Sequence, residues 1–149
     1  MGWVDRLYGT TVALDSAPLI YYVELHPKYL ALLDPFFDAV QRGDLQVITT
    51  TLTLTEVLVH PYKRGDLRLA NQYSRLLLNS RNLQTLPVTP AIAADAAQIR
   101  ATNRSKTPDS IQLATARAGN ATAFLTNDSH VPALPGIEII VLDHLFANP

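Results

Sequence analysis

Four acidic residues of this chain stand where strands end or helices begin. Asp15 follows the apolar run T-V-A-L, and Asp128 follows F-L-T-N late in the chain. Glu56 lies within T-L-T-E-V-L, and Asp109 lies within T-P-D-S-I-Q. Carboxylate oxygens are the ligands that Mg²⁺ takes in proteins, and a bound ion can activate water for hydrolysis. If the four acids converge, they predict a metal-dependent hydrolytic site.

Each acid also has a structural explanation. Asp15 suits a helix N-cap, Asp109 suits the first turn of a helix, and Asp128 can stabilise an Asx turn. Glu56 fits such a role less well, because apolar residues flank it on both sides. Two unit charges 4 Å apart repel by about 4 kcal/mol at an effective dielectric of 20, so a shared site needs a cation or raised pKa values.

The elements that must position these acids are expected from the hydrophobic pattern. Short apolar runs predict strands at 11–14, 46–50, 83–88, 122–126 and 137–142. Amphipathic or alanine-rich runs predict helices that begin after Asp15, at 30–40, 52–59, 67–78 and 91–101, and from Thr107 to Gly119. The helix at 52–59 is expected to stop before Pro61. The last two strands are near-continuously apolar, which is typical of strands covered on both faces.

This alternation of strands and helices predicts one α/β domain with a central parallel sheet flanked by helices. In open sheets of this kind, ligands bind outside the carboxyl ends of the strands, near the point where strand order reverses. Asp15 and Asp128 each follow a strand end, and Glu56 and Asp109 lie where helices begin beside that edge. We therefore expect the four carboxylates to share a cleft.

Composition narrows the classes of function. The chain has 149 residues, of which 48% are hydrophobic and 17% charged, with a net charge of −1 and no cysteine. There is enough apolar material for one core, and no strongly basic surface or polybasic membrane segment is expected. The absence of cysteine excludes disulfides, thiolate nucleophiles and Cys-ligated zinc. No secretory signal or membrane-spanning run is recognisable, so a soluble cytoplasmic domain is expected.

The acidic motifs resemble those of a known family. T-V-A-L-D-S, T-L-T-E-V-L, T-P-D-S-I-Q-L-A-T-A and F-L-T-N-D are similar, in order and spacing, to the motifs of PIN-domain ribonucleases, and most of all to the VapC-type toxins of toxin–antitoxin pairs. The resemblance covers about residues 11–142 of a domain expected to span 1–149. It implies a PIN-like fold and RNA phosphodiester hydrolysis with Mg²⁺ or Mn²⁺.

The resemblance also implies roles for particular residues and partners. Asp15, Glu56, Asp109 and Asp128 would hold one or two metal ions, with Ser16, Thr126 and Asn127 in support. An antitoxin protein and a homodimer are expected partners besides RNA. The chain departs from the family pattern at Ser110, where alanine is usual, and lacks the aromatic residue often found shortly after the last acid. These departures bear on substrate fit, because neither removes an acid.

Several alternatives stay open at the level of sequence. Arg100, Arg104, Lys106 and Arg117 bracket the third acid and are candidates for RNA phosphate contacts, but solvated helix faces explain them nearly as well. Asp95 is expected to be a solvated helix residue outside the acid cluster. Two functions compete with the toxin: a nuclease of housekeeping RNA processing, and a non-catalytic PIN-fold module that binds protein or RNA.

Overall fold

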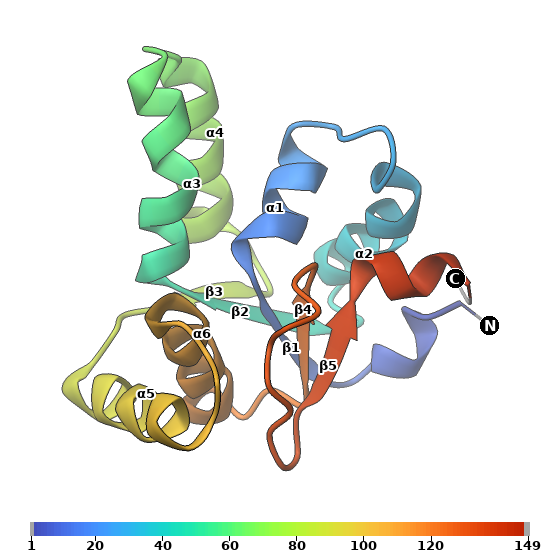
Figure 1. Ribbon diagram of the computed structural model, residues 1–149. Coiled ribbons are helices and arrows are strands. Elements are labelled where there is room, and N and C mark those ends of the chain that lie inside the picture. The colour runs from blue at the N-terminus through green and yellow to red at the C-terminus, as the bar shows by residue number, and fades with distance from the viewer. Residues whose placement is uncertain (1, 148–149) are drawn as a thin grey trace.

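The computed structural model describes residues 2–147 and contains a five-stranded parallel sheet flanked by helices (Figure 1). The strands are β1 (Thr11–Leu14), β2 (Gln46–Thr50), β3 (Leu83–Leu86), β4 (Ala123–Thr126) and β5 (Glu138–Val141). The α-helices are α1 (Ser16–Val23), α2 (Leu30–Arg42), α3 (Thr51–Lys63), α4 (Leu67–Asn79), α5 (Pro90–Thr102) and α6 (Thr107–Ala118). Short 3₁₀ helices lie at η1 (Asp5–Leu7) and η2 (Leu142–Phe146). The expected α/β fold with a central parallel sheet is confirmed.

The strand order places a reversal at the centre of the sheet. The order is β3-β2-β1-β4-β5, so the chain moves outward from β1 to β3 and then returns to place β4 on the other side of β1. Val12 pairs with Val47 of β2 and with Ala123 of β4, which makes β1 the central strand. The carboxyl ends of β1 and β4 therefore form the switch point at which ligands bind in such sheets.

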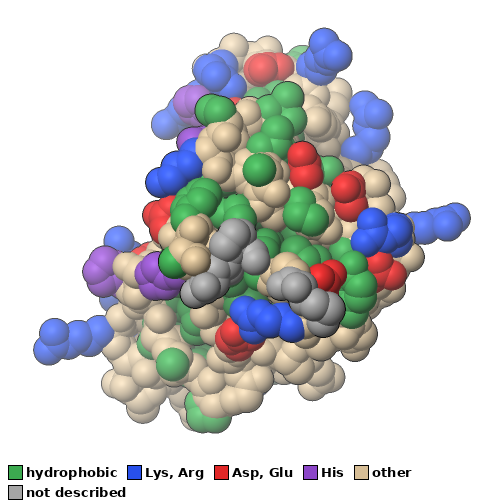
Figure 2. Space-filling view, turned by 90° about the vertical axis from the view of Figure 1, so that its right-hand side faces the viewer, with side chains coloured by type: hydrophobic (Ala, Val, Ile, Leu, Met, Phe, Trp, Pro, Cys, Tyr) green, Lys and Arg blue, Asp and Glu red, His purple; other side chains and the backbone are tan. Residues whose placement is uncertain are grey.

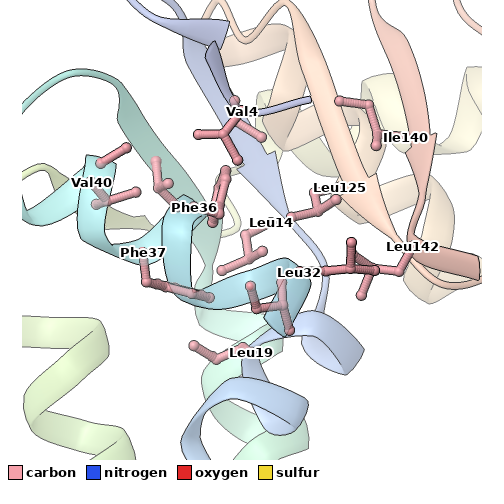
Figure 3. Close-up of a cluster of buried hydrophobic side chains, with 14 of the residues drawn as sticks. Val4, Leu14, Leu19, Leu32, Phe36, Phe37, Val40, Leu125, Ile140 and Leu142 are labelled. Atoms are coloured by element: carbon pink, nitrogen blue, oxygen red, sulfur yellow. The ribbon is translucent and has the colours of Figure 1, made fainter. Parts of the chain in front are cut away.

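Two hydrophobic clusters cover the two faces of the sheet. The larger one joins β1, β4 and β5 to α1, α2 and the 3₁₀ helices, and Figure 3 shows Phe36 of α2 beside Leu14 of β1. The second cluster packs α5 and α6 against Ile48 and Phe124 on the opposite face. Alternating side chains of each strand thus point into two separate cores, as expected for a sheet with helices on both sides.

The end of α6 depends on close packing against the sheet. A Cβ at Gly119 would lie 2.3 Å from the Cδ1 atom of Ile48, so only glycine allows this approach without movement of the strand side chain. Asn120 follows with a φ of 58° and takes the left-handed conformation that ends the helix. Gly119 and Asn120 are thus needed for different reasons. Gly119 allows close packing against the sheet, and Asn120 turns the chain out of the helix.

Three expectations about the elements were wrong. The strand predicted at 83–88 ends at Leu86. The helix predicted to stop before Pro61 continues to Lys63, with the proline ring buried inside it. Packing of α3 against α4 outweighs the backbone hydrogen bond that proline removes. The strand predicted at 137–142 is shorter, and only its end is buried, because β5 is an edge strand with Glu138 exposed.

The surface has mixed charge. Figure 2 shows the side of the molecule that carries β5 and the chain ends, where hydrophobic side chains lie among acidic ones and several basic side chains project from the rim. This mixture accords with the net charge of −1. Within the described residues, no helix is both long and apolar enough to cross a bilayer.

Candidate active site

The two strand-end acids are held together at the switch point by a threonine hydroxyl. Thr126, fully buried at the end of β4, donates through Oγ1 to Oδ2 of Asp15 at 2.7 Å. Thr126 Oγ1 also accepts the backbone N–H of Asp128 at 3.0 Å. The sheet pairing continues one residue further, since the Asp15 N–H donates to the Leu125 carbonyl. The register of β1 and β4 thus fixes both acids.

Asp15 also caps α1. Its Oδ1 accepts the backbone N–H of Ser16 at 2.7 Å, so both carboxylate oxygens have donors. Burial raises the pKa of the Asp15 carboxyl, and the nearby charge of Asp128 adds to that rise. The hydrogen bonds from Thr126 and Ser16 act in the opposite direction, because they stabilise the ionised form. The structural role predicted for Asp15 as a cap and a role in an acid cluster are therefore compatible.

Glu56 joins the site from α3. It lies in the second turn of that helix, which follows β2 without a loop and so begins at the carboxyl edge of the sheet. The Ser16 hydroxyl donates to Glu56 Oε1 at 2.7 Å and links the glutamate to the residue beside Asp15. The Glu56 side chain is exposed to solvent. The apolar residues next to Glu56 in the sequence lie on other faces of α3. The face that carries Glu56 is therefore accessible to solvent.

Asp109 approaches from the other helical layer. It is the third residue of α6, a position favoured by the helix dipole, and is partly buried. Burial raises the pKa of its carboxyl, and the charges of Asp15, Asp128 and Glu56 raise it further. Lys106, at the N-cap of α6, opposes this rise. Asp109 therefore lies within reach of the charges of the other three predicted acids, at the same edge of the sheet.

The donor set fits a hard divalent cation. Its members are carboxylates accompanied by the hydroxyls of Ser16 and Thr126, and these oxygens suit Mg²⁺ or Mn²⁺ better than softer metals. Across residues 2–147, no three acidic or histidine side chains already lie in the arrangement of a metal centre. Mg²⁺ keeps several waters and needs only one or two direct carboxylates, so the chemistry of the site suits a hydrated ion.

Asn127 has other partners than expected. Its Nδ2 donates to the Tyr29 hydroxyl at 3.0 Å and to the Tyr21 hydroxyl at 3.4 Å, and its Oδ1 accepts the Asp143 N–H at 3.0 Å. Tyr29 in turn donates to Asp143 Oδ1 at 2.7 Å, and this bond is the main reason the pKa of Asp143 is lowered. Asn127 thus anchors the turn before Asp128 to α1, the start of α2 and η2.

Of the four basic residues predicted to contact RNA, two bind side chains of this protein and two are exposed next to α6. Arg117 lies in the last turn of α6, where it forms a bidentate ion pair with Asp95 of α5 at 2.9 and 3.0 Å, and Arg100 donates to the Thr107 hydroxyl. Lys106 and Arg104 are exposed in the segment that leads into α6. Asp95, expected to be a solvated helix residue, is partly exposed and also joins α5 to α6 through this ion pair. Lys106 is the cation placed beside the acids.

The departure at Ser110 has a structural explanation. Its buried hydroxyl donates to the Lys106 carbonyl at 3.0 Å and lies 2.7 Å from the Ser105 hydroxyl. The serine therefore stabilises the first turn of α6, which carries Asp109. Two residues after the last acid, His130 donates its backbone N–H to Asp128 Oδ1 at 2.9 Å. The spacing D-x-H was the signal for this contact, and the sequence reasoning did not use it.

Several solved structures share this architecture, and one of them is a toxin–antitoxin complex from Klebsiella pneumoniae, with a TM-score of 0.63 at 20% identity over 85% of this chain and 94% of that one. A chain of VapBC2 from Rickettsia felis, solved with a promoter DNA fragment, has a TM-score of 0.66 at 14% identity, over 87% of this chain and 96% of that one. FitAcB from Neisseria gonorrhoeae gives 0.64 at 19% identity, over 90% and 99%. VapC20 from Mycobacterium tuberculosis, described as a Sarcin-Ricin loop cleaving toxin, gives 0.62 at 13%, over 76% and 86%. At these identities the likeness establishes the fold.

The sequence itself also matches a family model. No curated protein matches the chain at a significant level. The model of the PIN domain, in contrast, matches residues 12–137, which include all four acids and every strand of the sheet except the first residue of β1 and the whole of β5. The chain therefore belongs to the PIN domain family.

Proposed function

We propose that this protein is a Mg²⁺- or Mn²⁺-dependent endoribonuclease that hydrolyses RNA phosphodiester bonds. The observation that carries the proposal is the gathering of four carboxylates at the switch point of the sheet. Hydroxyl groups link Asp15, Glu56 and Asp128, and Asp109 lies within reach of their charges. Helix capping accounts for the bond between Asp15 and the Ser16 N–H, but not for the bonds from Thr126 to Asp15 and from Ser16 to Glu56. Those two hydroxyls orient carboxylates, which favours an enzyme over a non-catalytic module.

The reaction divides the work among the site residues. Water attacks the phosphorus, the bond to the leaving oxygen breaks, and that oxygen takes up a proton. When bound, a divalent cation supplies a Lewis acid and lowers the pKa of its water. Asp15, Glu56, Asp109 and Asp128 would hold it, while Thr126 and Ser16 keep Asp15 and Glu56 oriented. Lys106, and Arg104 close to it in the chain, would contact RNA phosphates beside the acids.

Chelation is expected to abolish RNA cleavage. Purified protein treated with EDTA should lose activity on a mixture of RNAs, and Mg²⁺ or Mn²⁺ should restore it, because the four acids repel one another and hold no water in a reactive state without an ion. Cleavage is followed by gel electrophoresis, with protein carrying Asp109→Asn as the control for contaminating nuclease. Undiminished cleavage by metal-stripped protein would contradict the metal-dependent mechanism.

We also propose that the enzyme is the toxin of a toxin–antitoxin pair. The support is the fold shared with VapBC and FitAcB proteins and the gathering of four acids at one edge of the sheet. A basic side chain of an antitoxin segment placed among Asp15, Glu56, Asp109 and Asp128 would relieve the same repulsion that a metal ion relieves. The expected homodimer stays a prediction.

Expression of the protein alone is expected to arrest growth of a bacterial host, because unrestrained RNA cleavage stops translation. Co-expression with a small protein encoded next to it should restore growth and yield a complex that lacks ribonuclease activity. The inactive variant Asp109→Asn serves as the control for the burden of expression. Normal growth at high levels of active enzyme would favour the alternative, a nuclease of RNA processing.

A further inference from the structure

A buried polar contact joins the two helices that carry Glu56 and Asp109. The side chains of Thr53 in α3 and Gln112 in α6 are 0% and 3% exposed. Gln112 Nε2 donates to Thr53 Oγ1 at 2.6 Å. Polar groups buried this deeply are hydrogen-bonded in folded proteins, because an unpaired one loses its solvation without compensation. A relative position of α3 and α6 that keeps this hydrogen bond is therefore favoured over positions that break it.

The register of this contact matches the acids. Thr53 lies three residues before Glu56, and Gln112 lies three residues after Asp109. Residues three apart on an α-helix are neighbours on the same face, so each partner lies one turn from its acid. The contact between Thr53 and Gln112 is thus linked to both carboxylates by a single turn of rigid helix.

The helical acids need such a contact more than the strand-end acids do. Asp15 and Asp128 are placed by the pairing of β1 with β4 and by the Thr126 hydroxyl. α3 packs with the core on one face of the sheet and α6 with the core on the other, so strand pairing does not fix their separation. The two helices touch, and within residues 2–147 the bond from Gln112 to Thr53 is the only side-chain hydrogen bond between them.

We propose that Thr53 and Gln112 are positioning residues that set the distance between Glu56 and Asp109, and thereby the affinity of the cleft for a divalent cation. The inference rests on the proposed function for its metal ion, but the helix contact itself can be tested without one. Neither residue is required to touch the ion or RNA. Their effect passes through the placement of α3 against α6.

The absence of cysteine allows a direct test of helix placement. Nitroxide labels attached at Val59→Cys and Ala118→Cys, both exposed and outside the acid cluster, report the distance from α3 to α6 in the metal-free protein. We expect Gln112→Met to shift or broaden this distance distribution, because it removes the donor at nearly constant volume. Thr53→Val should do the same, and Thr53→Ser should restore the parent distribution because it retains the hydroxyl.

Metal affinity is measured on the same variants without labels. Calorimetric titration with Mn²⁺ should show about 10- to 100-fold weaker binding for Gln112→Met and for Thr53→Val, as is usual when residues that orient metal ligands are replaced. The double variant should be little worse than either single one, because both remove the same contact. In RNA cleavage assays at saturating RNA and fixed Mn²⁺, the loss should appear in kcat and be reduced by added Mn²⁺.

Thr115→Val is the matched control. This buried threonine of α6 donates to the Ile111 carbonyl within its own helix, so the same change there should lower stability without altering the helix distance or Mn²⁺ affinity. If Gln112→Met lowers the melting temperature but leaves both the distance distribution and Mn²⁺ affinity at the wild-type values, the positioning role is wrong. Failure of the wild-type protein to bind Mn²⁺ would instead overturn the proposed function, and the label distances would still decide whether the pair places the helices.

Discussion

Asp109→Asn and Asp15→Asn are each expected to lower kcat for RNA cleavage by about 10² to 10⁴-fold, the range typical of groups that activate the attacking water or stabilise its reaction. Asparagine keeps the shape of the side chain and removes its charge. At Asp109 the change leaves the helix start intact, and at Asp15 it retains an oxygen that can accept the Ser16 N–H. Single-turnover kinetics with a defined RNA would measure the loss.

Asp95→Asn is the control for this loss. Asp95 forms an ion pair with Arg117 at the far end of α6 from Asp109, and an exposed pair of this kind contributes about 0–1 kcal/mol to stability. Its replacement should leave kcat unchanged. An inactive Asp95→Asn enzyme, or an active Asp109→Asn enzyme, would show that the acid cluster is assigned to the wrong residues.

The metal-free Asp109→Asn variant is expected to be more stable than the wild type at pH 7. The pKa of Asp109 is raised in the folded protein, so the folded state binds the proton more tightly than the unfolded state. Its contribution to stability is fully present below the ordinary value of 3.8 and is lost as pH rises through the folded pKa. At neutral pH the ionised Asp109 carboxylate destabilises the folded state. Each 1 kcal/mol gained in the free energy of unfolding on its removal raises the melting temperature by about 2–4 °C.

Two further measurements make this result specific. The stability gain of Asp109→Asn should disappear when the pH is lowered below 3.8, where the wild-type acid is already neutral in both states. Mg²⁺ at 100 times its dissociation constant should stabilise the wild type by about 2.7 kcal/mol and the variant by less. Asp38→Asn, at an exposed position of α2, should change stability by at most ~0.5 kcal/mol. If Asp109→Asn is instead less stable than the wild type at pH 7, Asp109 acts mainly by stabilising the start of α6 through the helix dipole.

The placement of the acids at one edge was predictable because it depends on local patterns and on the general geometry of α/β sheets. A short apolar run followed by an acid predicts a strand with a carboxylate at its end, and parallel strands end at the same edge. Asp15 and Asp128 follow β1 and β4, which are neighbours at the reversal of strand order. Their roles in metal binding stay predictions until the variants are measured.

Where prediction from sequence was wrong, tertiary contacts outweighed a local preference. Pro61 was expected to end a helix, but α3 continues through it to Lys63 because its packing against α4 compensates. The partners of Asn127 were likewise not predictable: its side-chain amide donates to the tyrosines of α1 and of the segment before α2, and its supporting role for Asp128 stays a prediction. Those partners are about a hundred residues away along the chain, so no local pattern contains them.

The sequence by itself therefore determined the class of fold, the order of its elements and the edge at which the four acids lie, since each follows from periodicity and from strand and helix ends. Only the tertiary structure decided which side chains hold those acids. Thr126 reaches Asp15 across 111 residues of sequence, and Gln112 reaches Thr53 across 59. Such contacts depend on how elements that are distant in the sequence pack together. That packing is determined by side chains throughout the core, so no single stretch of sequence predicts it.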